Sequence, residues 1–228
     1  MNDHELAATL ATDAGRLLLQ VRAELSDAPA ADRKAQGDKR SHDFLMAQLA
    51  RARPADAVLS EEGADNLVRL DAARVWIVDP LDGTREFSEL DRDDWAVHVA
   101  LWEGGDLVAG AVALPGQGVT IATPEVPAPS THAGTPRVLV SRTRPPAVAL
   151  QVRDALGGAL VEMGSAGAKV AAVIQGRAEV YVHAGGQFEW DSAAPVAVAR
   201  AAGLHTSRID GTPLRYNRSD PRLPDVVV

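Results

Sequence analysis

The sequence of 228 residues contains no cysteine. Disulfide bonds, thiolate metal sites and a cysteine nucleophile are therefore excluded. It also lacks an excess of basic residues, because 23 Lys and Arg stand against 31 Asp and Glu, and the net charge is −8. That balance disfavours a broad surface for nucleic-acid phosphates or for an anionic membrane. We therefore expect neither a nucleic-acid polymer nor a membrane as a partner.

Long apolar runs are missing as well. No stretch approaches the roughly 18 apolar residues of a membrane span. The first residues, MNDHELAATLATDAGRLLLQ, have no basic flank followed by an apolar core, which is the pattern of a signal peptide. These absences predict a cytoplasmic protein. With 46% hydrophobic residues, the chain can still bury a sizeable core, in one large domain or two small lobes.

Helical and extended patterns alternate along the first half of the chain. Apolar residues recur at helical spacing from Leu6 to Leu25, which predicts a long amphipathic helix. The stretch SDAPAADRKAQGDKR reads as a polar loop, and a second helix is expected from Ser41 to just before Pro54. WAVHVALWEGGDLVAGAVAL alternates around two glycines, which is typical of a hairpin.

The second half begins after a segment rich in proline. Residues 123–136 hold four prolines and no periodicity. We take 124–136 as a linker between an α+β lobe over 1–123 and an α/β lobe over 137–228. In the second lobe we expect strands near 137–141, 159–163 and 179–183, and helices opening near Pro145-Pro146, at about 165 and near Asp191. The alternation predicts an α+β (α/β layered) fold whose strand order stays open.

The stretch VWIVDPLDGTREF contains two carboxylates in one turn. A buried strand is expected at 75–78, and Asp79 and Asp82 follow it. Two fixed carboxylates side by side are costly unless a cation lies between them. Oxygen ligands without His or Cys suit Mg²⁺, which prefers carboxylates, water and substrate phosphate. The alternative is an ordinary Asp-rich turn, since Asp-Gly is common in turns.

Acidic residues elsewhere extend this pattern. Glu61-Glu62 closes a short strand at 58–60, although a solvated acidic loop would read the same way. Asp191 opens an Ala-rich helix, where Asp is also a good capping residue. The histidines, His98 among them, have no metal-like spacing and are given ordinary structural roles. Together the carboxylates have the composition of a multi-Mg²⁺ phosphoryl-transfer site.

The motif WIVDPLDGT, preceded by LSEEG and followed by EWDSAA, resembles the lithium-sensitive, Mg²⁺-dependent phosphatases of the inositol monophosphatase family. The stretch from Gly164 to Gly203 is most similar to the bacterial CysQ type of 3′(2′),5′-bisphosphate nucleotidase. The resemblance runs from roughly Leu10 to the end of the chain. It implies the inositol-monophosphatase-like sugar-phosphatase fold, with alternating αβαβα layers. Similar proteins generally continue with another helix, so a further segment after Val228 is expected.

The resemblance also implies roles for individual residues. The expected metal ligands are Glu61, Asp79, the Leu81 carbonyl, Asp82 and Asp191, with Glu61 also counted as catalytic. Thr84 and Asp43 are expected to orient the attacking water. The Val-Thr pair of the family is absent from GDKRSHDF, so Asp38 competes with Asp43 for this role.

Substrate contacts follow from the same resemblance. Lys169 is expected to meet a 5′-phosphate and Ser165 the nucleotide, although an ordinary solvent-facing lysine is the alternative at Lys169. Glu189 is expected to touch a sugar hydroxyl, unless it only supports neighbouring residues. The full expected set is Gly83, Thr84, Ser165, Lys169, Glu189 and Asp191.

The resemblance implies hydrolysis of the 3′-phosphate of 3′-phosphoadenosine 5′-phosphate, or of the corresponding 5′-phosphosulfate, and a link to sulfate assimilation. Two to three Mg²⁺ are expected; three would balance four ligand carboxylates and a phosphate dianion. Inhibition by lithium and a homodimer are implied as well. The alternatives are an inositol-1-phosphate or fructose-1,6-bisphosphate phosphatase, and a non-catalytic module that binds nucleotide or Mg²⁺.

Overall fold

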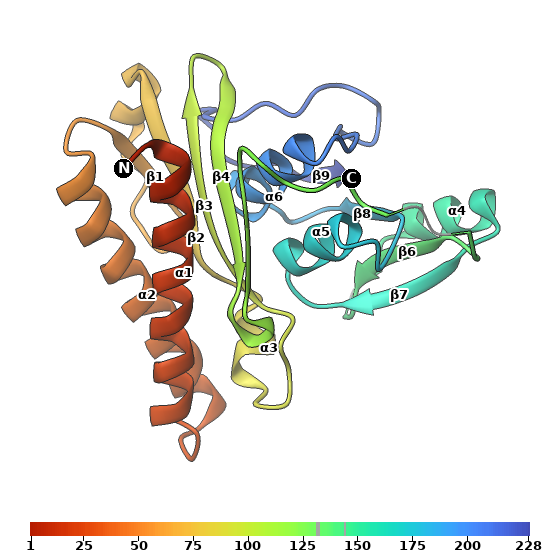
Figure 1. The fold of residues 1–228 in the computed structure, drawn as a ribbon, viewed down its shortest axis with the longest axis horizontal. Helices are drawn as coiled ribbons and strands as arrows, with labels where there is room; N and C mark the ends of the chain where they lie inside the picture. The colour runs from red at the N-terminus through yellow and green to blue at the C-terminus, as the bar shows by residue number, and fades with distance from the viewer. Residues whose placement is uncertain (131–132, 144) are drawn as a thin grey trace.

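Two β-sheets organise the chain, as Figure 1 shows for a computed structural model that describes residues 1–130, 133–143 and 145–228. The first sheet has five strands in the order β1-β2-β3-β4-β5, and the second has four in the order β7-β6-β8-β9. The strands are β1 (Ala57–Ser60), β2 (Arg74–Asp82), β3 (Ala96–Glu103), β4 (Asp106–Leu114), β5 (Val119–Ala122), β6 (Arg137–Ser141), β7 (Ala159–Met163), β8 (Val180–Ala184) and β9 (Asp225–Val227).

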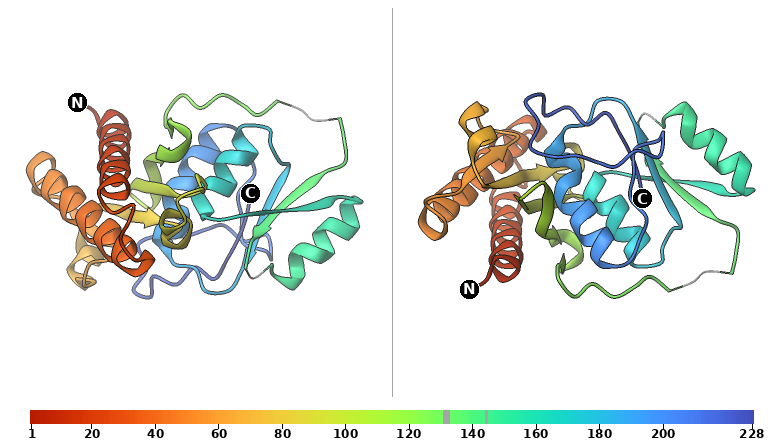
Figure 2. Two further views of the ribbon diagram at one scale, coloured as in Figure 1. Left: turned by 90° about the horizontal axis from the view of Figure 1, so that it is seen from below. Right: turned by 90° about the horizontal axis from the view of Figure 1, so that it is seen from above.

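Helices cover both faces of these sheets. They are α1 (Asp3–Glu24), α2 (Ala30–Ala52), α3 (Thr84–Ser88), α4 (Ala147–Leu156), α5 (Ala166–Ile174) and α6 (Glu189–Ala201), with short 3-10 helices η1 (Leu67–Asp71) and η2 (Pro115–Gln117). Helices α1 and α2 lie on one face of the first sheet, α5 and α6 lie between the sheets, and α4 covers the second sheet (Figures 1 and 2). This order gives the αβαβα layers that the sequence predicts. None of the described helices combines the length and apolar character needed to cross a membrane.

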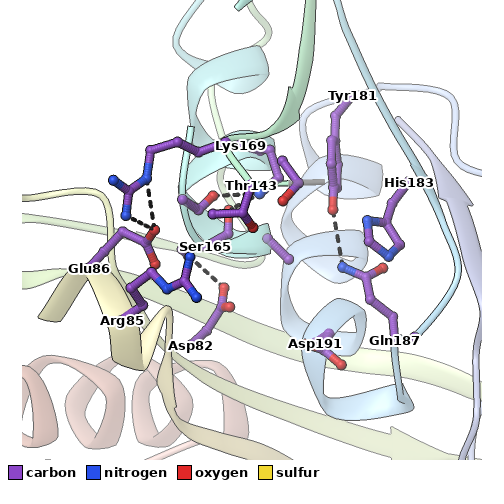
Figure 3. A pocket seen from close by; sticks show the side chains of 15 residues that line it. Asp82, Arg85, Glu86, Thr143, Ser165, Lys169, Tyr181, His183, Gln187 and Asp191 are labelled. Carbon is purple, nitrogen blue, oxygen red and sulfur yellow. Dashed lines mark hydrogen bonds and ion pairs between the residues drawn. The ribbon is translucent and has the colours of Figure 1, made fainter. Parts of the chain in front are cut away.

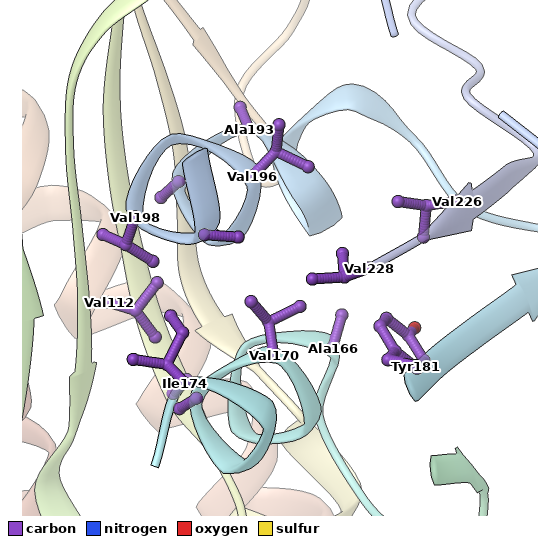
Figure 4. Close-up of a cluster of buried hydrophobic side chains, with 14 of the residues drawn as sticks. Val112, Ala166, Val170, Ile174, Tyr181, Ala193, Val196, Val198, Val226 and Val228 are labelled. Carbon is purple, nitrogen blue, oxygen red and sulfur yellow. The ribbon is translucent and has the colours of Figure 1, made fainter. Parts of the chain in front are cut away.

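The largest core fills the space between the two sheets. Figure 4 shows Val170 and Ile174 of α5 facing Val196 and Val198 of α6, with Val112 of β4 beside them. A second core lies between α1, α2 and the other face of the first sheet. Because the first core draws residues from both expected lobes, the two halves of the chain pack as layers of one structure. The proposed lobe boundaries themselves stay a prediction.

Most expected elements form where the sequence places them. The N-terminal helix, the hairpin of β3 and β4, and the alternating elements after residue 137 are confirmed. Described residues of the expected linker, 124–130 and 133–136, form no helix or strand, and residues 131–132 lie outside the described part.

The second helix begins at Ala30, so the interpretation of residues 26–40 as a polar loop is wrong. Its buried face is formed by Gly37, Ser41, Leu45 and Leu49. These residues are four apart and lie on one side of the helix. The first two are not apolar, so the hydrophobic periodicity fades in the first half of the helix.

Close packing of α6 on β4 generates the first prediction. A Cβ atom on Gly110 would lie 2.5 Å from Cβ of Ala197, so the helix can approach the strand only because Gly110 has no side chain. Gly110→Ala is expected to lower the free energy of unfolding by about 1–3 kcal/mol through overpacking. Ala197→Gly alone should cost about 1 kcal/mol in helix propensity.

The double variant Gly110→Ala/Ala197→Gly relieves the clash, so it should be more stable than the sum of the single changes. Urea denaturation of the four proteins measures this coupling. Strict additivity would show that this contact does not set the distance between α6 and the sheet.

Candidate metal centre and active site

Three carboxylates, two of them buried and the third partly buried, converge at the end of β2. Asp79 and Asp82 terminate this strand, and Asp191 is the third residue of α6. One carboxylate oxygen from each lies within 4.8 Å of the other two. Asp79 is 1% exposed and Asp82 is 8% exposed. The structure therefore brings together two sequence segments that are more than 100 residues apart, as the resemblance implies.

An irregularity in β2 places both strand carboxylates at the cluster. Asp79 is opposite His98 of β3 and Asp82 is opposite Ala96, so the register slips by one residue between them. A bulge of this kind re-aims side chains at the end of a strand. Gly83 follows with a φ of 84°, a left-handed conformation that favours glycine, and α3 begins directly after it.

Each carboxylate of the cluster is anchored by a backbone N–H. The Leu81 N–H donates to Asp79 Oδ1 at 3.0 Å, and the Phe188 N–H donates to Asp191 Oδ2 at 2.7 Å. The Gly167 N–H donates to Asp82 Oδ2 at 2.7 Å. One oxygen of each side chain is thereby fixed, and the other is left to serve the cluster.

Repulsion among these carboxylates shows in their pKa values. Burial, followed by the negative charges of Glu61, Asp82 and Asp191, raises the pKa of Asp79 well above its usual range. Burial and the charge of Asp82 raise the pKa of Asp191 to about 7. A cation at the cluster would remove this cost. The donors are carboxylate and carbonyl oxygens, which fit a hard divalent ion such as Mg²⁺.

Glu61 reaches the cluster from the neighbouring strand. β1 and β2 are parallel, with Ser60 beside Val78, so Glu61 follows next to Asp79. Glu61 as a whole is exposed, but its carboxyl is crowded by protein. That crowding and the charge of Asp191 raise its pKa to about 7, and it shares a hydrogen bond with Asp79. Its place fits the expected metal-binding role, which stays a prediction.

Asp82 has two further partners besides the Gly167 N–H. The Ser165 hydroxyl donates to Asp82 Oδ2 at 2.5 Å, and His98 Nε2 lies 3.2 Å from the same oxygen. Burial would raise the pKa of Asp82, but His98 and these hydrogen bonds hold it below its ordinary value. In the part of the chain that the structure describes, every one of these contacts falls on Oδ2, which leaves Oδ1 available as a ligand.

His98 was missed as a site residue in the sequence. It is fully buried, and its Nδ1 lies 3.1 Å from the Trp190 carbonyl oxygen. A Cβ on Gly167 would come within 2.1 Å of His98 Nε2, so the ring fits only against glycine. The sequence showed only that His98 belongs to an expected strand. Its position beside Asp79 follows from the register of β2 and β3, which the sequence does not give.

The expected pairing of Thr84 with Asp43 is not formed. Thr84 Oγ1 lies 3.3 Å from Asp38 Oδ1 and 3.1 Å from the Leu81 carbonyl oxygen. Asp43 is solvent-exposed and forms an ion pair with Lys39. Five residues advance an α-helix by about 140° beyond a full turn, so Asp43 lies on another side of α2 from Asp38. The competing candidate, Asp38, is therefore the partner of Thr84.

Asp38 has an altered acidity. Burial and the negative charge of Glu62 raise its pKa to about 6, although the hydrogen bond with Thr84 opposes the shift. Above that pH the carboxylate is ionised and able to accept a proton. Glu62 thus acts on Asp38 through its charge.

A cleft of about 310 Å³ opens beside the cluster (Figure 3). Asp82 and Asp191 line it, and so do Ser165 and Lys169, from the start of α5 and from α5 itself. Ser165 Oγ donates to Asp82 and accepts from the Ala168 N–H at 3.0 Å, so its hydroxyl is already engaged. Its expected contact with a nucleotide stays a prediction.

Lys169 is buried beside the cleft, so the alternative of an ordinary solvent-facing lysine is wrong, and its contact with a 5′-phosphate stays a prediction. Its Nζ donates to the carbonyl oxygens of Gly164, of Ser165 at 2.8 Å and of Met163 at 3.4 Å. It also lies 5.2 Å from the centre of the Tyr181 ring. Burial lowers its pKa to about 8, although the nearby carboxylates oppose the shift. The ammonium is thus held against the backbone that leads into α5.

Both carboxylate oxygens of Glu189 are engaged by backbone groups, which fits the alternative that it supports neighbouring residues, and its expected contact with a sugar stays a prediction. Glu189 is fully buried, and its two oxygens accept the backbone N–H groups of Asn217 at 2.6 Å and Arg218 at 2.8 Å. Burial raises its pKa to about 7, although these two hydrogen bonds oppose the shift. The carboxylate therefore fixes the chain segment that follows Tyr216.

Two arginines of the cleft were not singled out in the sequence. Arg142 follows β6 and forms ion pairs with Glu86 of α3 and with Glu89. Arg85, in α3, lines the same cleft. The only local signal for Arg85 was its position directly after Thr84.

Known proteins match nearly the whole chain. The sequence profile of the inositol monophosphatase family matches residues 4–225. The "3′-phosphoadenosine 5′-phosphate phosphatase" of Mycobacterium bovis is 54% identical over 226 residues, covering 95% of this chain and 84% of that protein. The "3′(2′),5′-bisphosphate nucleotidase CysQ" of Escherichia coli is 32% identical over 230 residues, covering 91% of each chain.

Solved structures share the architecture. The crystal structure of CysQ from Bacteroides thetaiotaomicron is 26% identical in sequence and has a TM-score of 0.79, covering 97% of this chain and 95% of that one. Its layers therefore correspond to those described above. With the profile matched from the first turn of α1 into β9, this chain belongs to the inositol monophosphatase family.

Proposed function

We propose that this protein is a Mg²⁺-dependent phosphomonoesterase that hydrolyses the 3′-phosphate of 3′-phosphoadenosine 5′-phosphate to give AMP and phosphate. The observation that carries the proposal is the buried cluster of Asp79, Asp82 and Asp191, which opens into a cleft with cationic side chains. The names of the relatives at 54% and 32% identity support the nucleotide as substrate. The 5′-phosphosulfate has the same 3′-phosphate and belongs to the same proposal.

The cluster is suited to hold the metal. Asp79, Asp82 and Asp191, with Glu61 and the Leu81 carbonyl, would bind two to three Mg²⁺. Bound Mg²⁺ supplies neutralising charge for the phosphate oxygens and makes water more acidic. The backbone N–H groups that anchor the three aspartates fix the ligands before any ion arrives.

Thr84 and Asp38 provide the proton path. Thr84 Oγ1 has two acceptors within reach, Asp38 Oδ1 and the Leu81 carbonyl oxygen. When its single proton is directed to Asp38, a lone pair of the hydroxyl can accept a hydrogen bond from the attacking water. As the water oxygen attacks phosphorus, its proton passes through Thr84 to Asp38, and the bond from phosphorus to the 3′-oxygen breaks. The leaving oxygen takes a proton from solvent. A complete water-orienting pair favours an enzyme over a non-catalytic module.

A substrate comparison tests the proposal. Phosphate release from 3′-phosphoadenosine 5′-phosphate, inositol-1-phosphate and fructose-1,6-bisphosphate is measured at a few millimolar Mg²⁺, with and without lithium. We expect at least a hundredfold preference in kcat/KM for the nucleotide, equal to about 2.7 kcal/mol, and inhibition by lithium. Equal or reversed rates would sink the nucleotidase proposal, and no turnover at all would favour a binding module.

Asp38 and Asp43 form a matched pair of variants on one helix. Asp38→Asn removes the acceptor of the proton and should lower kcat by about 10²–10⁴-fold with little change in KM. Asp43→Asn changes the same chemical group at an exposed position and should leave kcat within a factor of two. Steady-state kinetics of both variants decide between them, and a loss of activity in Asp43→Asn alone would reverse the assignment.

Metal removal should make stability depend on pH. The folded-state pKa values of Asp79, Glu61 and Asp191 are raised, so metal-free protein loses stability as these groups ionise between about pH 4 and 7. The Tm of EDTA-treated protein should therefore be lower at pH 8 than at pH 5, by roughly 4–8 °C for a loss of about 2 kcal/mol.

Adding Mg²⁺ should restore the Tm at pH 8 and have little effect at pH 5. An ion present at 100 times its Kd adds about 2.7 kcal/mol. Asp79→Asn removes one of the repelling charges and should flatten the pH dependence of the metal-free protein. Thermal unfolding of both proteins provides the measurement, and a Tm that rises from pH 5 to pH 8 without metal contradicts the expected repulsion.

A further inference from the structure

We propose that Arg33 of α2 is a positioning residue for the reaction, because it holds the end of α3 and thereby keeps Thr84 within reach of Asp38. The inference rests on the proposed function, in which Thr84 and Asp38 carry the proton of the attacking water. Arg33 belongs to the stretch that the sequence predicts as a polar loop and that forms the first turns of α2. It does not line the cleft beside the carboxylate cluster.

In the described part of the chain, the guanidinium of Arg33 binds only backbone carbonyl oxygens. Its Nε and Nη2 donate to one and the same oxygen, that of Ser88, at 3.1 and 2.9 Å. Its Nη1 donates to the carbonyl oxygens of Leu25 at 3.3 Å, of Ser26 at 3.2 Å and of Ala28. One side chain therefore joins the end of α3 to the turn between α1 and α2. Arginine suits this task because its planar guanidinium carries five N–H donors.

Helix α3 depends on its neighbours for its position. It is a single turn of five residues, and helices this short are marginal in water on their own. Thr84 is its first residue and Ser88 its last. The last carbonyl groups of a helix have no partner within it, and Arg33 supplies donors to the Ser88 carbonyl. The contacts of α3 with other elements thus set the position of Thr84.

Helix α2 contacts α3 at both ends. Asp38 meets the first residue, Thr84, and Arg33 meets the last, Ser88. The distance from Thr84 Oγ1 to Asp38 Oδ1 is 3.3 Å, which is long for a hydrogen bond. A small displacement of α3 would therefore break the contact on which the proton path depends.

Arg33 extends the buried face of α2 by one turn. Arg33, Gly37 and Ser41 are four residues apart and lie on one side of the helix. Ser41 Oγ donates to the Pro80 carbonyl oxygen at 2.7 Å. A Cβ atom on Gly37 would come within 2.7 Å of the Phe87 ring, so the backbone of α2 lies directly against α3. Successive turns of α2 thus contact the strand end and α3.

A second arginine lies at the same end of α3. Arg22 of α1 donates to the Glu89 carbonyl oxygen, and its guanidinium carbon lies 6.0 Å from the centre of the Phe87 ring. Burial, followed by the positive charge of Arg33, lowers the pKa of Arg22. Two cations near each other are costly, so their contacts with α3 must offset this repulsion. Arg22 belongs to α1, whereas Arg33 joins α3 to the helix that carries Asp38.

Arg33→Met tests the inference, because it removes the donors and keeps most of the length of the side chain. On 3′-phosphoadenosine 5′-phosphate we expect kcat to fall about 10- to 100-fold, since a misplacement of about 1 Å costs on that order, with KM changed less than about threefold. Arg33→Lys should recover part of the loss, and it serves as the test if Arg33→Met does not fold.

Arg40→Met is the matched control on the same helix. Arg40 pairs with Glu24 of α1 at 2.6 Å and, among the described residues, has no hydrogen bond or ion pair with α3. Its removal also takes one arginine from the contact between α1 and α2. We expect kcat of this variant to stay within about twofold of the unaltered protein.

Two further measurements separate positioning from general damage. If Arg33 acts through Asp38, kcat of the double variant Asp38→Asn/Arg33→Met should stay within about threefold of that of Asp38→Asn alone. Hydrogen exchange followed by mass spectrometry needs no substrate. Amides of residues 84–89 should exchange at least about 10-fold faster in Arg33→Met, and at an unchanged rate in Arg40→Met.

Three results would overturn the inference. Losses that multiply in the double variant would show that Arg33 acts independently of Asp38. Unchanged exchange in residues 84–89 would show that α3 does not depend on Arg33, and unchanged kcat in Arg33→Met would show that Thr84 keeps its place without it. If the unaltered protein does not hydrolyse the bisphosphate, the proposed function fails and the catalytic role of Arg33 fails with it, whereas the exchange experiment still reports on α3.

Discussion

Mutual repulsion of buried carboxylates is the constraint on which this structure depends. Asp79, Asp82 and Asp191 each place a carboxylate oxygen within 4.8 Å of the others, and burial together with the neighbouring negative charges raises the pKa values of Asp79 and Asp191. Such a cluster is stable when backbone and side-chain donors fix each carboxylate and when protonation or a bound cation relieves the charge. The fixing is built into this chain, because every member accepts a backbone N–H from a different segment. At neutral pH, the Mg²⁺ ions proposed for this site would relieve the charge.

The layered fold delivers those segments to one place. The end of β2 supplies Asp79 and Asp82, the start of α5 supplies donors to Asp82, and the start of α6 supplies Asp191. Helices α5 and α6 pack on each other and share the core between the sheets, so their first turns are held in a fixed relation. Small residues make this possible, since Gly167 leaves room for His98 and Gly110 lets α6 approach β4. Packing in the core therefore sets the positions of these carboxylates.

Local patterns predicted the parts of the site that depend on neighbouring residues. The strand, the turn and both of its aspartates were evident in VWIVDPLDG, and Asp191 followed from the resemblance. What the sequence could not decide depends on long-range geometry. Asp38 can be chosen over Asp43 only when it is known which side of α2 faces Thr84. The contact of His98 with Asp82 depends on the strand register and on how closely α5 packs against the sheet. The partners of Lys169 and Glu189 are mostly backbone groups, which leave no trace in residue identity.

A positively charged side chain beside the cleft can either stabilise the protein or bind substrate. Lys169 and Arg142 are both next to the site, yet each is saturated by carbonyl or carboxylate oxygens of the protein. Their charges stabilise the walls, because a buried cation without partners would be costly. A cation for substrate has to meet the opposite requirement of being solvated and unpaired until substrate arrives. Arg85 of α3 lines the same cleft and, among the described residues, its guanidinium has neither a hydrogen bond nor an ion pair, so its surroundings differ from those of Lys169 and Arg142.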